Sequence, residues 1–354
     1  MDFRTFVMAD TPTTPSSAFR VAEPAGIVSP VPTSTMVDLL SSIWQRVLQL
    51  PSVGIDDNFF ELGGDSALAL ELFHQIALAG GRELPPVVIY HAPTISALAS
   101  LLEQSDTPRI PPLIQLKAGS EPPVFIAHGL GGSAMDFFQI VKHMLTPQAI
   151  YGMQAKGIDG VEEPLDRIED MARYALAAVR EKQPAGPYFL IGFSLGGLVA
   201  LEMAQQLIAQ GERIGLLAML DSYPYSSHLS FEQRGRVVIR QSWRWVAARL
   251  QWLGVPAPYR TTLHLPPSPS QQRFRDSDHQ ALEHYRPRFY PGKINFVRAA
   301  IPTDFPSNPD AIWSHLAQSL EVDTVSGDHL GIMTTHFEDL AAVLSRHLAE
   351  IPQK

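Results

Sequence analysis

The sequence contains no cysteine among its 354 residues. Disulfide bonds, thiolate metal ligands and a cysteine nucleophile are therefore excluded, which fits a cytoplasmic protein. Basic residues are also in the minority, because 27 Lys and Arg stand against 36 Asp and Glu, a formal net charge of −9. Nucleic-acid-binding domains normally carry a basic surface, so this balance argues against such a partner.

Long hydrophobic runs are missing as well. No apolar run reaches the roughly 18 residues that a membrane-spanning helix needs, and the first ten residues lack the basic stretch and long apolar segment of a signal peptide. We therefore expect no membrane span. With hydrophobic residues at 45% and charged residues at 18%, the chain can form ordinary globular cores, and its length leaves room for about two domains.

Proline is frequent in two segments that lack the sequence pattern of a folded domain. Residues 1–32 hold too little patterned apolar surface to fold alone, and they contain five prolines among Thr, Ser and Ala (Pro12, Pro15, Pro24, Pro30 and Pro32). We predict a disordered tail there. Residues 105–112 hold three more prolines and predict a linker. These segments delimit a first domain at 33–104 and a second at 113–354.

The first domain has the pattern of a small helical bundle. Apolar residues recur at three- and four-residue steps from Met36 to Leu48, which gives a helix one buried face. A second apolar helix follows Ser66, and shorter helical segments are predicted at 87–90 and 95–102. Four helices in so short a segment predict a four-helix bundle.

Strands alternate with helices in the second domain. Helical patterns cover 167–181 and 195–210, and strand-like apolar runs lie at 124–127, 150–153, 188–191, 214–220, 294–297 and 320–325. Such alternation predicts a mostly parallel sheet covered by helices on both faces. The expected fold class is therefore a four-helix bundle followed by an α/β domain.

A glycine pair precedes Ser66 at the start of the second helix. The segment reads Gly63-Gly64-Asp65-Ser66, and two glycines permit a tight turn. A serine at a helix N-terminus lies beside free N–H groups, which favour a phosphate. A Gly-Gly-Asp-Ser tetrapeptide alone is more often a plain serine near a helix cap, so the residues around it decide the interpretation.

The longer stretch, residues 57–66, reads Asp-Asn-Phe-Phe-Glu-Leu-Gly-Gly-Asp-Ser. It closely resembles the peptidyl carrier proteins of nonribosomal peptide synthetases, whose motif is D-x-F-F-x-L-G-G-D-S. The resemblance covers roughly residues 35–104. It implies that a phosphopantetheinyl transferase attaches 4′-phosphopantetheine to Ser66, and that the thiol of this group replaces the missing cysteine as the acyl handle.

A second serine, Ser194, lies between an apolar strand and an apolar helix in the pattern G-x-S-x-G. This context is the nucleophile elbow of an α/β-hydrolase, in which acid and base follow in the chain order Ser, Asp, His. The crowded turn needs glycine at Gly192 and Gly196. Asp221 ends the next strand-like run and His329 follows the last one. We predict Ser194 as the nucleophile, His329 as its base and Asp221 as the acid that orients the base.

Other residues compete for these roles. Asp328 is a poorer acid than Asp221, because it could not easily orient its immediate neighbour His329. Taken singly, five further histidines are more typical of surface or packing residues than of bases. His128 precedes the glycines of an early loop. The others fall in the segment inserted between the strand-like runs 214–220 and 294–297 or on helices (His264, His279, His284 and His336).

The oxyanion hole is predicted from backbone N–H groups alone. One donor is Leu195, directly after the nucleophile, and the other is Leu130, in the loop His-Gly-Leu-Gly-Gly that follows an early strand. The alternative for this loop is a glycine-rich connection with no catalytic contact. We prefer the catalytic interpretation because an α/β-hydrolase takes its first oxyanion donor from this loop.

The second domain resembles the terminal thioesterases of nonribosomal peptide and polyketide synthases. The matching segments are residues 192–197, 220–223, 327–329 and 151–155 with Gly157, and the resemblance covers 112–350. It implies an α/β-hydrolase fold with a helical lid at about 224–285. It also implies cleavage of a carrier-bound acyl or peptidyl thioester through an acyl-serine. Water would then hydrolyse this intermediate, or an internal amine or hydroxyl would close a ring.

Terminal modules of that family carry an adenylation domain before the carrier, and here only the tail precedes it. Either the chain works in trans with upstream adenylation and condensation modules, or it is a fragment of a larger synthetase. The initial Met1 favours the first of these.

Three other functions stay open: an editing thioesterase that clears misloaded carriers, a carrier scaffold with an inactive hydrolase domain, and a lipase or esterase. The intact Ser194, Asp221 and His329 argue against the scaffold, and the fused carrier argues against the esterase.

Charge differs between the lid and the carrier. Residues 229–260 contain six arginines against one glutamate, whereas residues 35–104 contain eight acids against two arginines. We hypothesise that the basic segment steers the acidic carrier towards Ser194 by electrostatic attraction. The alternative is a solvated lid face with no partner.

Overall fold

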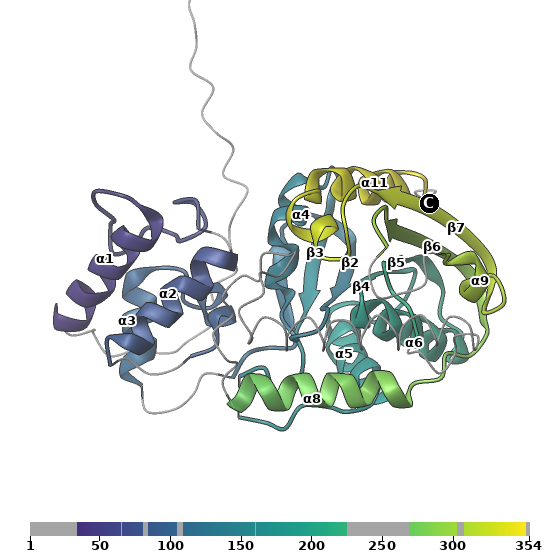
Figure 1. Cartoon of the computed structure of the whole chain (residues 1–354), viewed down its shortest axis with the longest axis horizontal. Helices are drawn as coiled ribbons and strands as arrows, with labels where there is room; N and C mark the ends of the chain where they lie inside the picture. The colour runs from purple at the N-terminus through teal and green to yellow at the C-terminus, as the bar shows by residue number, and fades with distance from the viewer. Residues whose placement is uncertain are drawn as a thin grey trace, which may run out of the picture.

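The structure, a computed structural model, places a group of helices beside a larger domain built on a β-sheet (Figure 1). It describes residues 34–64, 66–80, 84–104, 109–159, 161–224, 269–302 and 308–351, with the backbone alone at 66, 67 and 269–272. The predicted tail at 1–32, the basic segment 229–260 and most of the predicted lid lie outside these ranges.

Helical elements occupy the N-terminal part. They are α1 (Ser34–Leu48), α2 (Ser66–Leu78), the 3₁₀ helix η1 (Pro86–Tyr90) and α3 (Ile95–Glu103). Their core contains Trp44 and Phe59, both fully buried, whose rings meet edge to face with centroids 5.2 Å apart. Of the four helical segments that the sequence predicts, three are therefore α-helices and the fourth is a 3₁₀ helix.

A seven-stranded sheet forms the centre of the larger part, in the order β1-β3-β2-β4-β5-β6-β7. The strands are β1 (Leu113–Lys117), β2 (Ser120–Ala127), β3 (Gln148–Met153), β4 (Tyr188–Phe193), β5 (Ile214–Leu220), β6 (Tyr290–Ala299) and β7 (Ala317–Val325). All neighbours pair in parallel except β1, which runs antiparallel to β3. Each predicted apolar run lies within a strand. Only β1 was not predicted, because it is a short edge strand with two buried residues.

Helices cover both faces of this sheet (Figure 1). On one face lie α5 (Ile168–Lys182), α6 (Leu195–Ala209) and α8 (Pro269–His284), and on the other lie α4 (Phe138–His143) and α11 (Phe337–Ala349). Since β4 is buried along its whole length, its side chains alternate between the two cores. This layering fits an α/β-hydrolase. None of the helices in the described ranges is long and apolar enough to cross a bilayer.

Three further short elements lie in the described residues of the larger part: the 3₁₀ helix η2 (Ala134–Phe137), α9 (Asp310–Trp313) and α10 (Gly331–Thr334). The first of these leads from the glycine-rich loop after β2 into α4. The third follows the loop that carries His329. Both therefore lie close in sequence to predicted site residues.

Aromatic rings join the two parts of the chain. The ring of Phe60, before α2, lies 4.7 Å from that of Tyr90 in η1 and 4.8 Å from that of Phe138 at the start of α4. Tyr90 and Phe138 also meet edge to face, with centroids 6.5 Å apart. Burial, with a smaller effect of the Asp136 carboxylate, raises the pKa of Tyr90 well above its usual range. The N-terminal helices thus contact the segment that follows the glycine-rich loop.

Candidate active site

Ser194 stands on a strained turn between β4 and α6. Its backbone has φ 54° and ψ −118°, a conformation that non-glycine residues rarely adopt. The turn is tight enough that a Cβ at Gly192 would lie 2.1 Å from the Gly196 carbonyl oxygen, and one at Gly196 would lie 2.2 Å from that of His128. Both contacts are impossible for a larger residue, which explains the glycines of G-x-S-x-G.

The structure brings Ser194, His329 and Asp221 together from residues far apart in the sequence. His329 Nε2 lies 3.1 Å from Ser194 Oγ, and His329 Nδ1 lies 2.7 Å from Asp221 Oδ2. An ionised carboxylate can only accept, so Nδ1 donates to Asp221 and the neutral Nε2 is left to accept the hydroxyl proton. This is the arrangement in which a histidine activates a serine.

Asp221 is fixed by backbone as well as by His329. Its Oδ1 accepts a hydrogen bond from Ala299 N–H at 3.2 Å, and its own N–H donates to Val297 O at 2.7 Å. Its φ of 44° is again unusual for a non-glycine residue. One residue on, the Ser222 carbonyl accepts from the indole Nε1–H of Trp313 at 3.1 Å. These contacts from β6 and α9 hold the carboxylate in place against the imidazole.

The competing residues lie elsewhere or bind differently. Asp328 Oδ1 accepts from Gly331 N–H at 2.7 Å, in the loop that leads into α10. His128 is buried, donates from Nδ1 to Gly129 O at 2.9 Å, and has a pKa lowered by burial, so it stays neutral. His279 and His284 are exposed, His336 lies 3.9 Å from Asp339, and His264 is outside the described residues. In the described part of the chain, the contact to Ser194 Oγ comes from His329.

The two predicted oxyanion donors lie on either side of this serine in the chain. Leu195 is the first residue of α6, so its N–H is among the first-turn amides that have no partner within the helix. Leu130 lies in the loop after β2, where Gly131 and Gly132 both have positive φ. This loop runs close to the elbow, because the His128 carbonyl faces Gly196.

A cavity opens beside the same loop, on the α5 and α6 face. Its walls are mostly apolar and include His128, Met153, Met171, Val199 and Phe274. Ser194 is not among the lining residues. The cavity therefore lies next to the glycine-rich loop rather than at the nucleophile itself.

The backbone around Ser66 suits a phosphate-linked group. Ser66 is the first residue of the thirteen-residue helix α2, so helix amides and the helix dipole favour an anion there. The turn before it is tight, since a Cβ at Gly64 would lie 2.3 Å from the Phe59 ring, and Gly64 N–H donates to Phe59 O at 2.9 Å. The residues present fit attachment of phosphopantetheine.

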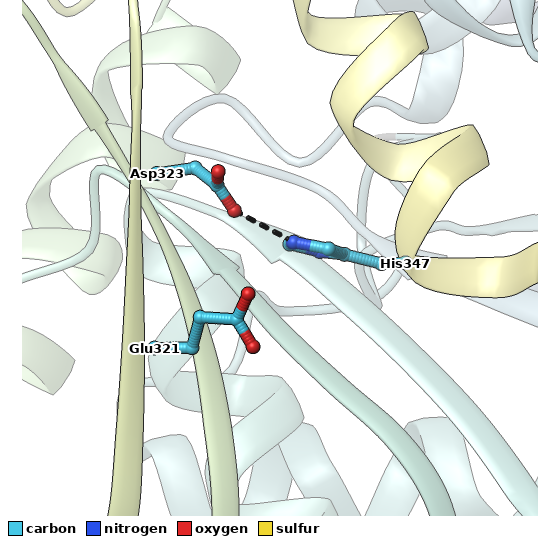
Figure 2. Close-up of side chains that lie close together, drawn as sticks. All are labelled: Glu321, Asp323 and His347. Carbon is cyan, nitrogen blue, oxygen red and sulfur yellow. Dashed lines mark hydrogen bonds and ion pairs between the residues drawn. The ribbon is translucent and has the colours of Figure 1, made fainter. Parts of the chain in front are cut away.

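One cluster of possible metal ligands occurs in the described residues, away from these sites. Asp323 and Glu321 project from β7 towards His347 of α11, whose Nε2 lies 2.7 Å from Asp323 Oδ2 (Figure 2). However, Lys293 lies 2.5 Å from Glu321 and Arg346 lies 2.6 Å from Asp323. The carboxylates are already paired with cations, so the cluster reads as an ion-pair network that ties α11 to β7.

Three residues around the site were not predicted from the sequence. The Phe193 ring stacks on the His329 imidazole, Trp313 holds the Ser222 carbonyl, and Asp278 accepts from Gly131 N–H at 3.1 Å. The position of Phe193, next to the nucleophile, could have suggested a contact with the base. The sequence around Trp313 and Asp278 does not indicate these contacts, because each side chain forms a hydrogen bond with a segment more than 90 residues away.

Two family models match the chain. The model described as "Thioesterase domain" matches residues 122–259, and the model described as "Phosphopantetheine attachment site" matches residues 38–102. A dimodular nonribosomal peptide synthase of Bacillus subtilis (strain 168) is 40% identical over 225 residues, which cover 61% of this chain and 10% of the relative. The chain thus spans about a tenth of the length of that curated relative.

Solved structures resemble the fold. A four-domain nonribosomal peptide synthetase matches 95% of this chain and 28% of its own, with a TM-score of 0.56 and 23% identity. The type II thioesterase BorB from the borrelidin biosynthetic cluster matches 69% of this chain and 99% of its own, with a TM-score of 0.51 and 18% identity. At this identity the likeness extends to the fold alone.

Proposed function

Because the chain joins a phosphopantetheine attachment domain to a thioesterase domain, we propose that it carries an acyl or peptidyl group and releases that group in a pathway of nonribosomal peptide type. The carrier domain is assigned to residues 33–104 and the thioesterase domain to 113–354, with a helical lid at about 224–285. The observation that carries the proposal is the hydrogen-bonded series Ser194, His329, Asp221 in a domain fused to a carrier.

Release begins with Ser194 as nucleophile. As Oγ attacks the thioester carbonyl carbon, its proton passes to His329 Nε2, and Asp221 stabilises the imidazolium that forms. The negative charge on the carbonyl oxygen is stabilised by the N–H groups of Leu130 and Leu195. Collapse of this tetrahedral species breaks the C–S bond, and His329 returns the proton to the departing thiolate. The acyl group then stays on Ser194 as an ester.

A second attack frees the product. Water, or an amine or hydroxyl within the acyl group, gives up its proton to His329 as it attacks the ester, and Ser194 leaves with that proton. Hydrolysis and ring closure use the same residues, so the choice between them depends on the acyl group and on what surrounds it. The editing of misloaded carriers would also use the same residues.

Ser66 is the proposed attachment residue. A phosphopantetheinyl transferase would catalyse attack of the Ser66 hydroxyl on the pyrophosphate of coenzyme A, which forms the phosphodiester and releases adenosine 3′,5′-bisphosphate. The amides at the start of α2 would favour the phosphate of the attached group. When attached, phosphopantetheine supplies the thiol that holds the acyl group as a thioester. Upstream adenylation and condensation modules are the proposed source of that acyl group.

Mass spectrometry of the intact, phosphopantetheinylated chain tests the proposal. We expect the wild type, loaded with a series of candidate acyl groups, to lose the mass of its cognate group with time. Ser194→Ala should load equally well but keep the acyl mass on the carrier. Equal loss of the group from wild type and Ser194→Ala would overturn the assignment of the nucleophile. Preferential loss of short, non-cognate groups would favour editing over product release.

A further inference from the structure

Helix α8 places a carboxylate in the protein interior. Phe274, Asp278, Ala281 and Tyr285 recur at three- and four-residue steps and are all buried, with Asp278 only 1% exposed. A buried carboxylate is costly unless it accepts hydrogen bonds. Asp278 Oδ2 accepts one from the backbone N–H of Gly131, 147 residues earlier in the chain.

The same helix makes a second contact with this loop. The Phe274 ring lies so close to Gly132 that a Cβ there would be 2.5 Å from the ring Cζ. On its other side the loop is tied to the end of β3, because Ala155 N–H donates to Gly132 O at 2.9 Å. Gly131 and Gly132 are therefore held by α8 and by the segment after β3.

Leu130, the predicted oxyanion donor, lies between two peptide groups that are both fixed. The Leu130 N–H belongs to the same planar peptide as the Gly129 carbonyl, which accepts from His128 Nδ1 at 2.9 Å and from Gly132 N–H at 3.3 Å. The following peptide contains the Gly131 N–H that Asp278 accepts. The Leu130 side chain is 44% exposed, so it does little to anchor the loop.

We infer that Asp278 is a positioning residue: by accepting the Gly131 N–H it holds the loop after β2 so that the Leu130 N–H faces the oxyanion formed at Ser194. This inference rests on the proposed function. Asp278 does not touch the reacting atoms, and its effect passes through the peptide between Leu130 and Gly131. It also links the loop after β2 to the helix α8, which forms the C-terminal end of the predicted lid at about 224–285.

Steady-state kinetics of the full chain on a soluble acyl thioester test this role. Removing an oxyanion donor typically lowers kcat by 10²–10³, so loss of its positioning in Asp278→Ala should lower kcat by about ten- to a hundredfold, with KM within about twofold. Asp278→Asn keeps an oxygen acceptor at the same place and should restore kcat to within a few-fold of wild type. Asp276→Ala, which removes an exposed acid from the same helix, is the matched control and should change neither constant.

A trifluoromethyl ketone analogue of the substrate supplies a second readout, because it forms an oxyanion on Ser194. Its affinity should fall in Asp278→Ala in parallel with kcat/KM, and recover in Asp278→Asn. A loss in Asp278→Asn as large as in Asp278→Ala, or a rise in KM at constant kcat, would overturn the positioning role. If Asp278→Ala does not fold by circular dichroism, Asp278→Leu, which is larger but branches at the same carbon and has no acceptor, takes its place. Failure of both variants to fold would assign Asp278 to stability instead.

Ser194→Ala in the same assay separates this inference from the proposed function. Full turnover in Ser194→Ala would overturn the proposed nucleophile, whatever Asp278 does. Abolished turnover in Ser194→Ala with normal kcat in Asp278→Ala would overturn the positioning role alone.

Discussion

The ring of Phe193 is stacked on the imidazole of His329, with centroids 4.6 Å apart and planes inclined by 26°. The same ring lies 2.9 Å from the position that a Cβ on Gly129 would take. Phe193 is thus packed between the base and the glycine-rich loop. The stacked ring limits the orientations that the His329 imidazole can take.

Phe193→Ala should therefore lower kcat without removing any reacting group. A freed imidazole samples orientations away from Ser194 Oγ, and displacement of a reacting group by about 1 Å can cost up to a hundredfold in rate. We expect a loss of about ten- to a hundredfold in kcat on a soluble thioester. Phe193→Tyr, which keeps the flat ring, should stay within a few-fold of wild type. Similar losses in the two variants would argue against stacking as the cause.

The acid that orients His329 can be tested by paired amide substitutions. Asp221→Asn should lower kcat by roughly 10⁴, as in the serine-protease triad, because an amide no longer fixes the imidazole tautomer. Asp328→Asn should have a small effect, since Asp328 accepts from Gly331 N–H rather than from His329. Near-native far-UV spectra would show that both variants fold. Greater damage from Asp328→Asn would reverse the assignment.

Local sequence signals predicted much of the fold and of the candidate site. Residues at strand ends, such as Ser194 and Asp221, could be identified because apolar runs and glycines mark each strand and turn. Parallel strands buried on both faces give near-continuous apolar runs, which is why six of the seven strands were predicted. The family resemblance added the carrier and the thioesterase, which the family models show.

Long-range contacts could not be predicted in the same way. The three- and four-residue steps from Phe274 to Asp278 and Ala281 place Asp278 on the buried face of α8, unlike Asp276, but this spacing does not indicate what the carboxylate binds. Its hydrogen bond to Gly131 depends on how the helix packs against the loop. The indole bond from Trp313 to the Ser222 carbonyl and the Phe60–Phe138 contact likewise join segments far apart in the sequence.

The chemistry of the carrier should be separable from that of the hydrolase. Ser66→Ala should abolish phosphopantetheinylation, because the attachment hydroxyl is gone. Hydrolysis of a soluble thioester should stay near the wild-type rate, since Ser194, His329 and Asp221 are untouched. Intact mass after incubation with a transferase, together with the soluble assay, checks both statements. Loss of soluble-substrate activity would reveal an unexpected role for Ser66.

The aromatic contact between the two parts should hold η1 against α4. Phe138→Ala removes the ring that meets both Phe60 and Tyr90, and aromatic pairs contribute about 0.5–1.5 kcal/mol each beyond their buried area. Hydrogen exchange of the backbone amides of residues 87–90 should therefore accelerate in the full chain. Leu145→Ala, at an exposed position after α4, is the control. Unchanged exchange in Phe138→Ala would show that this ring does not hold η1 in place.

Asp278 should also make stability depend on pH in an unusual direction. Burial raises its pKa to about 7, from an ordinary value of 3.8, although the Gly131 N–H opposes the shift. Between about pH 4 and pH 7 the folded chain keeps a proton that the unfolded chain has released. The free energy of unfolding therefore falls as pH rises through this window, by up to about 1.4 kcal/mol per pH unit from this group.

Asp278→Asn removes this dependence, because an amide does not titrate and still accepts from Gly131. At pH 8 the variant should be more stable than wild type by up to a few kcal/mol, whereas at pH 4.5 the difference should shrink to about 1 kcal/mol. Urea unfolding of both proteins at several pH values measures that difference directly, and other titrating groups largely cancel from it. Burial also raises the pKa of Asp136, to about 6, so the Asp278→Asn variant should keep a weaker pH dependence of the same sign. Asp276→Asn, on the exposed side of α8, should leave the pH profile as it is, and a gain in stability from Asp278→Asn that did not change with pH would contradict the raised pKa.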